Sequence, residues 1–75
     1  MAKEDGVKEF SPRSTAIGSV RWEAMAGQES VGMLTVTFLG GQSYVHHDVP
    51  REVVKEFRAA VSAGGFYNRE IKGRY

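Results

Sequence analysis

The residues His46, His47 and Asp48 stand next to each other and are of types that bind metal ions. Histidine nitrogens and carboxylate oxygens are zinc ligands, whereas cysteine, the third common ligand, does not occur in the chain. Adjacent residues of a strand point to opposite faces of a sheet, so His46 and His47 are not expected to share one ion. His46 would share its face with Asp48 alone, and two protein ligands make a poor zinc site. We therefore expect partly exposed histidines, with no metal and no cofactor.

Serine, histidine and aspartate together could also form a nucleophilic triad. The sequence contains no nucleophile-elbow motif, and Asp48 is too close to His46 along the chain to orient its ring. Gly40-Gly41 is not a phosphate-binding loop, because no lysine and serine follow it in helical register. These patterns predict no catalytic residue and no small-molecule substrate. The chain is better interpreted as a binding module than as an enzyme.

A mixture of aromatic and basic residues marks the C-terminal segment. Arg69, Lys72 and Arg74 lie within six residues, close to Tyr67 and Tyr75. Such a mixture can hold single-stranded RNA through phosphate contacts and base stacking. It equally suits a protein interface, where tyrosine and arginine are enriched. A solvated tail is a third interpretation of the same residues.

A predicted strand over residues 42–48 adds to this candidate surface. Its Tyr44 would stack on a base or anchor a protein if it faces outward, and would belong to the core if a helix covers it. The hypothetical partner-binding residues are therefore Tyr44, His46, Tyr67, Arg69, Lys72 and Arg74.

Two strands are predicted from apolar residues that alternate with polar ones. The clearer strand runs over 32–38, where Leu34 and Val36 share one face with Phe38. An earlier strand within 14–24 carries Trp22 in the same kind of alternation, and a polar loop over 26–30 follows it.

Gly40-Gly41 indicates a tight type I′ turn after the second strand, because both central positions of such a turn need positive φ. A third strand over 42–48 would then lie antiparallel to the second, since a short hairpin joins them.

Pro50 ends the third strand and opens a predicted helix over 51–63, because proline fits the first turn of a helix. Gly64-Gly65 should stop this helix, and a short final helical turn should bring Ile71 inward. The apolar stripe of the helix consists of Val53, Val54, Phe57, Ala60 and Val61.

The predicted fold is α+β: a three-stranded antiparallel sheet packed by one helix (β-β-β-α), with a short C-terminal helical turn. Residues 14–75 would form this single domain. Residues 1–13 show no period and are expected to form a flexible N-terminal tail. Alternatively, they form a recognition arm that orders on binding, with Phe10 as its anchor.

The charge and hydropathy of the chain limit its classes of partner. Ten basic and nine acidic residues give a net charge of +1, well short of a strongly basic domain. Residues 1–50 hold four basic and six acidic groups, a net of −2, and residues 51–75 hold six and three, a net of +3. No apolar run approaches the roughly 20 residues of a membrane span, and no secretory signal follows Met1. We expect a cytoplasmic protein without a membrane partner.

The order of short motifs along residues 14–75 resembles the KTSC domain. That domain is named for its place at the C-terminus of some lysyl-tRNA synthetases, and it also occurs as a stand-alone small bacterial or phage protein. Trp22 and His46 stand at positions where the family commonly has tyrosine. The matching positions are Ser14, Ile17, Val20, Leu34, Val36, Phe38, Gly41, Tyr44, Asp48, Val49, Pro50, Phe57, Ser62, Gly64, Phe66, Tyr67, Asn68, Ile71 and Tyr75.

The resemblance implies no established catalytic activity. Its synthetase context suggests RNA binding, although His46 weakens the expectation of paired tyrosines that stack on bases. Some stand-alone phage-encoded small proteins of this general kind act instead on the host transcription machinery. We therefore expect a non-enzymatic protein-binding module, a phage-type transcription regulator that docks on bacterial RNA polymerase in the host cytoplasm. An RNA-binding module that uses the aromatic-basic surface is the alternative.

Overall fold

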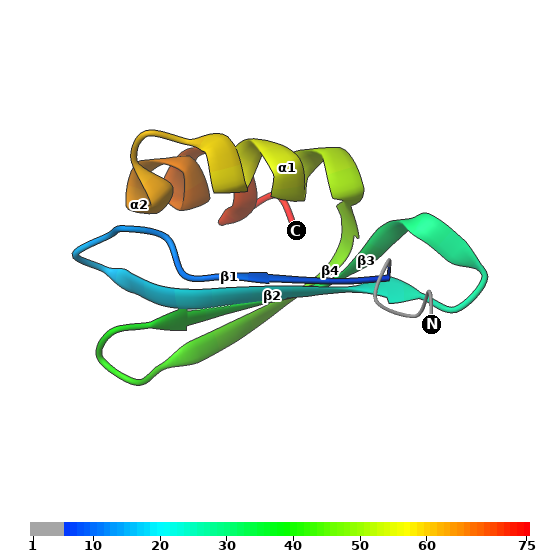
Figure 1. The fold of residues 1–75 in the computed structure, drawn as a ribbon, viewed down its shortest axis with the longest axis horizontal. Helices are drawn as coiled ribbons and strands as arrows, with labels where there is room; N and C mark the ends of the chain where they lie inside the picture. The colour runs from blue at the N-terminus through cyan, green and yellow to red at the C-terminus, as the bar shows by residue number, and fades with distance from the viewer. Residues whose placement is uncertain (1–5) are drawn as a thin grey trace.

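Four antiparallel strands form one sheet, and the helical segments cover one of its two faces (Figure 1). The computed structural model describes residues 6–75. The strands are β1 (Val7–Phe10), β2 (Ile17–Met25), β3 (Gln28–Phe38) and β4 (Ser43–Pro50), and each pairs with the next along the chain. They are followed by α1 (Arg51–Ala59), the short α2 (Ala63–Phe66) and a π-helical turn, η2 (Tyr67–Ile71). The predicted α+β class with an antiparallel sheet is confirmed.

The predicted number of strands is wrong, because β1 lies within the segment that was expected to be a tail. β1 pairs with β2, and Phe10 stands opposite Val20. The Phe10 ring meets the Phe57 ring edge to face, with 5.7 Å between their centroids, so Phe10 packs on the core instead of anchoring a free arm. A strand of this length and mixed polarity gives no periodic signal, and its place is set by tertiary contacts. Residues 1–5 of the expected tail lie outside the described residues.

The predicted single helix is also wrong, because the chain forms α1 and then α2. The helix α1 ends at Ala59, and Val61 is fully exposed instead of joining the apolar stripe. Ser62 caps the next helix, since its Oγ accepts a hydrogen bond from the Gly65 backbone N–H at 3.1 Å. Gly64 and Gly65 were expected to end the first helix, but they lie inside α2. The first helix ends earlier, at Ala59, and Ser62 begins the next one.

The hairpin connections differ from their predictions in length and in turn type. Ala26 and Gly27 alone join β2 to β3, with Gly27 at φ +80°, where a longer loop was expected. Residues 39–42 join β3 to β4, and of the two glycines there Gly41 has positive φ, at +100°. The predicted type I′ turn is therefore wrong.

A β-bulge at Asp48 changes which side chains of β4 face the helices. Leu34 pairs with His46 and Gly32 pairs with Val49, so one residue of β3 stands opposite two of β4. Asp48 takes up the extra residue at φ +58°. Val49 consequently joins the helix-facing side and is fully buried. Strict alternation placed Asp48 there beside His46, and the bulge overturns that prediction.

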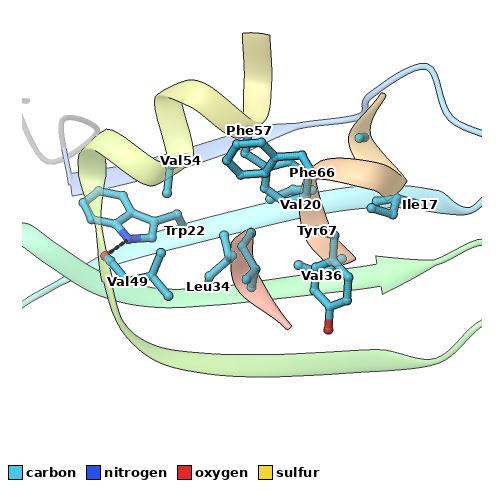
Figure 2. Packing of buried hydrophobic residues seen from close by; sticks show 12 residues of the cluster. Ile17, Val20, Trp22, Leu34, Val36, Val49, Val54, Phe57, Phe66 and Tyr67 are labelled. Carbon is cyan, nitrogen blue, oxygen red and sulfur yellow. Dashed lines mark hydrogen bonds between the residues drawn. The ribbon is translucent and has the colours of Figure 1, made fainter. Parts of the chain in front are cut away.

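The hydrophobic core lies between the helices and the sheet face that they cover (Figure 2). Trp22 is fully buried, and its Nε1–H donates a hydrogen bond of 2.9 Å to the Val49 carbonyl oxygen. Phe57 stacks on Phe66 with 5.3 Å between ring centroids. Ile71 is buried, as predicted. The complete cluster is Ile17, Val20, Trp22, Leu34, Val36, Val49, Val54, Phe57, Ala63, Phe66, Tyr67 and Ile71.

Replacing Phe57 with alanine should lower the free energy of unfolding by about 3–5 kcal/mol, because the ring is buried and contacts two further rings. Urea titration followed by tryptophan fluorescence measures the change. Glu56→Ala, an exposed neighbour on α1, is the matched control and should shift stability by less than about 0.5 kcal/mol. A Phe57→Ala curve that superimposes on the parent curve would contradict the packing of α1 on the sheet.

Candidate binding groove at the β4 edge

Strand β4 forms one edge of the sheet, and η2 lies beside it on the helix-covered face. Cross-strand pairing places Tyr44 opposite Val36 and His46 opposite Leu34, so both side chains rise on that face. Figure 2 shows the Tyr67 hydroxyl pointing out of the hydrophobic cluster toward β4. Residues from β4 and η2, distant in the sequence, therefore meet at this edge.

Four rings form a continuous series of edge-to-face contacts at the edge. The centroids are 5.6 Å apart for Tyr44 and Phe38, 5.3 Å for Phe38 and Tyr67, and 5.4 Å for Tyr67 and His46. Edge-to-face pairs of this kind add stability beyond the area they bury. The series is therefore a preformed wall rather than a set of mobile side chains.

Hydrogen bonds fix the orientation of the His46 ring. Its Nδ1 lies 3.3 Å from the Tyr75 backbone oxygen, and its Nε2 lies 2.9 Å from the Tyr67 hydroxyl. A carbonyl oxygen only accepts, so Nδ1–H donates to Tyr75. In the neutral ring Nε2 then accepts from the Tyr67 O–H. Both nitrogens are engaged within the protein, which leaves no lone pair of His46 directed at a metal.

The Tyr67 hydroxyl remains a donor over a wide range of pH. Burial raises the pKa of this hydroxyl above its ordinary value of 10.0, and the nearby Tyr44 raises it further. The phenol therefore stays protonated at neutral pH and keeps its hydrogen bond to His46.

A groove of about 670 Å³ opens between the β3–β4 hairpin and η2. Leu39 and Tyr44, which are 62% and 46% exposed, stand on its hairpin side. Lys72 contributes the basic group, and no acidic side chain lines the groove among residues 6–75. The lining residues are Thr15, Ala16, Phe38, Leu39, Gly40, Gln42, Tyr44, His46, Tyr67, Asn68 and Lys72.

The groove brings together four of the six residues predicted as a partner-binding set: Tyr44, His46, Tyr67 and Lys72.

The other two, Arg69 and Arg74, lie on either side of Glu70. Arg69 Nε is 3.5 Å and Arg74 Nη1 is 3.9 Å from its carboxylate oxygens. The sequence analysis left out Glu70, although it directly follows Arg69 and stands four residues before Arg74, the spacing of a helical ion pair.

Sequence reasoning missed Leu39 and assigned Phe38 to the core alone. Leu39 follows directly after the alternating residues of β3, in a turn where an apolar side chain has no core to enter. An apolar residue beside a glycine turn was the available signal. Tyr44 was predicted to be either a core residue or an outward contact residue. It lies on the helix-covered face, as a core residue would, yet it is half exposed.

Within residues 6–75 no three histidine, cysteine or acidic side chains converge where they could hold an ion. His47 and Asp48 border a separate small pocket beside Met33. None of the helices in this part of the chain is long and apolar enough to cross a membrane.

Comparison with known proteins identifies the family. A model of the KTSC domain matches residues 13–75. The chain belongs to the KTSC domain family. A protein of Tsukamurella paurometabola is 36% identical to the chain over 53 residues, which are 71% of this chain and 79% of that protein.

The fold is also similar to a solved structure of the family. A crystal structure of a KTSC domain protein from Yersinia pestis has a TM-score of 0.74 and 26% sequence identity, and the match covers 91% of this chain and 89% of that chain. The structural match covers a larger share of the chain than residues 13–75 do. It therefore includes part of the segment before residue 13.

Replacing Tyr67 with phenylalanine should make the free energy of unfolding fall less steeply as pH rises into the alkaline range. The folded state raises the pKa of this hydroxyl, so the stability that it contributes is complete below about pH 10 and is lost as pH rises through the folded value. Urea titrations at a series of pH values compare the slopes of parent and variant. Tyr44→Phe is the control, because it removes the smaller cause of the shift and should keep most of the slope. An unchanged slope in Tyr67→Phe would contradict this account.

Proposed function

We propose that this KTSC domain is a non-enzymatic protein-binding module whose contact surface is the β3–β4 hairpin with the groove beside it. The observation that carries the proposal is a pair of exposed apolar side chains that border one groove at the hairpin. Leu39 is 62% exposed and Tyr44 is 46% exposed, and both line the groove. Exposed apolar side chains that lie together on a small protein are typical of an interaction surface.

The edge strand itself supports the same surface. From Ser43 to His47, β4 carries no lysine, arginine or acidic residue, and natural edge strands commonly use such charges to prevent pairing with other chains. Tyrosine is enriched in interface hot spots, and Tyr44 lines the groove beside Leu39. The proposed partner therefore contacts the hairpin with apolar side chains and fills the groove next to Tyr44.

The proposed partner is a component of the bacterial gene-expression machinery, with RNA polymerase as the candidate and transcription regulation as the role. This choice rests on the resemblance of the chain to stand-alone small proteins of the family. The contact surface is proposed independently of it, from the exposed side chains.

An RNA-binding function is the second candidate, favoured by Lys72 lying in a groove with two tyrosines. Two observations make it weaker. Arg69 and Arg74 each contact Glu70, which offsets part of their charge. The uncovered sheet face also lacks a stacking platform, since the aromatic residues of the described strands all stand on the helix-covered side: Phe10, Trp22, Phe38 and Tyr44.

A tagged-protein pull-down from a bacterial lysate tests the proposal, run with and without nuclease at low and high salt. The parent should retain a protein after nuclease and at high salt, since apolar contacts weaken little with ionic strength whereas phosphate contacts weaken steeply. The double variant Leu39→Ser/Tyr44→Ser should lose that protein. Mass spectrometry identifies it, and RNA polymerase subunits are the expected result.

Val61→Ser is the matched control, because Val61 is an exposed apolar residue away from the hairpin. It should retain the partner as well as the parent does. Retention by the double variant would overturn the hairpin as the contact surface. Capture that disappears with nuclease would overturn the protein-binding module and favour the RNA-binding alternative.

A further inference from the structure

A second groove, of about 480 Å³, lies at the opposite edge of the sheet, between β1 and α1. In Figure 1 the helix α1 runs above β1, and ring contacts between the two elements show that they are neighbours. The lining residues are Lys8, Phe10, Arg51, Val54, Lys55, Arg58 and Ala59. None of them belongs to the groove at the β4 edge.

Apolar side chains form the floor of this second groove. Phe10 contributes from β1, and Val54 and Ala59 contribute from α1. Phe10 is held by its edge-to-face contact with the buried Phe57. The floor is thus an outward continuation of the core and is preformed.

The walls of the groove are basic. Four of the ten basic residues of the chain line it: Lys8, Arg51, Lys55 and Arg58. The three on α1 are spaced by four and then three residues, which places them on one side of the helix. No lining residue in the described part of the chain is acidic, and the two glutamates of α1, Glu52 and Glu56, lie outside the groove.

Aromatic rings orient two of these guanidinium groups. Arg58 Cζ is 5.9 Å from the centre of the Phe10 ring, and Arg51 Cζ is 5.6 Å from the centre of the Trp22 ring. Cations held over ring faces keep a defined position. Two of the four positive charges around the apolar floor are therefore held by ring contacts.

The neighbouring backbone suits an extended ligand. Among residues 6–75, β1 is an outer strand whose partner in the sheet is β2, and it carries the charged residues Lys8 and Glu9. Charged side chains on an edge strand hinder pairing with most chains, so an extended segment that lies along this edge has to complement the charge of the groove. Its alternate side chains then point to the same side. A ligand with an apolar side chain on the floor would place the residues two before and two after it against the basic walls.

We propose that the groove between β1 and α1 binds an extended acidic peptide segment of another protein, in the pattern carboxylate, any residue, apolar residue, any residue, carboxylate. The apolar side chain lies on Phe10 beside Val54, and the carboxylates meet Lys55 and Arg58 of α1. This inference goes beyond the proposed function, because it assigns a separate surface at the other edge of the sheet.

Fluorescence anisotropy with a labelled synthetic peptide tests the inference. The core of the peptide reads aspartate, threonine, leucine, threonine, aspartate. The parent should bind it at low salt, and Lys55→Ala/Arg58→Ala should weaken binding by at least about tenfold, since each charge-assisted contact is worth about a factor of ten. Lysine in place of both aspartates should abolish binding, and serine in place of leucine should weaken it.

Arg69→Ala/Arg74→Ala is the matched control, because it removes the same charge on the other side of the molecule. It should bind the acidic peptide as the parent does, and so should Leu39→Ser/Tyr44→Ser, which separates this site from the proposed hairpin surface. Thermal melts establish that every variant is folded. Amide NMR shifts caused by the peptide should concentrate at residues 7–10 and along α1.

Three outcomes would overturn the inference. The parent could fail to bind the acidic peptide, or the peptide could bind equally to both double charge variants, which would indicate net charge alone. In the third outcome, the peptide does not bind, whereas a single-stranded RNA or a vesicle of anionic phospholipid binds through Lys55 and Arg58. That result would assign the groove to phosphate groups instead.

Discussion

The buried hydrogen bond between the Trp22 indole and the Val49 carbonyl oxygen determines where the helices lie on the sheet. It joins β2, across the sheet, to the end of β4, where Pro50 leads into α1. A buried carbonyl without a donor is costly, so the bond and the tight fit of the indole reinforce each other. The bulge at Asp48 is a precondition, because it turns Val49 inward. The start of α1 is thereby fixed over Trp22.

Both candidate surfaces depend on this position of α1 over Trp22. With α1 starting over Trp22, its basic side faces β1, and Arg51 lies over the indole ring. The helix then leaves the β4 side uncovered, and η2 returns there to place Tyr67 against His46. The two edges of one sheet are thus given different chemistry, with basic walls at one edge and aromatic rings at the other.

Sequence patterns predicted the features that depend on local periodicity: the apolar face of Leu34 and Val36, the helix after Pro50, and the burial of Phe57. They did not predict features that depend on distant contacts. β1 exists because β2 and the Phe57 ring hold it, and the bulge depends on one non-glycine residue accepting positive φ. The candidate site was predicted in part. Its aromatic members and Lys72 meet, whereas both arginines pair with Glu70, a residue whose spacing was visible in the sequence but was not considered.

The position of β1 relative to the family match separates the two walls of the basic groove. The strand precedes residues 13–75, the segment that the family model matches, so one wall of the basic groove lies inside that segment and the other lies outside it. A substitution at Lys8 would change the charge of the groove without entering the hydrophobic cluster. Variation at these few residues before the matched segment would therefore change the charge of the groove while the hydrophobic cluster stays the same.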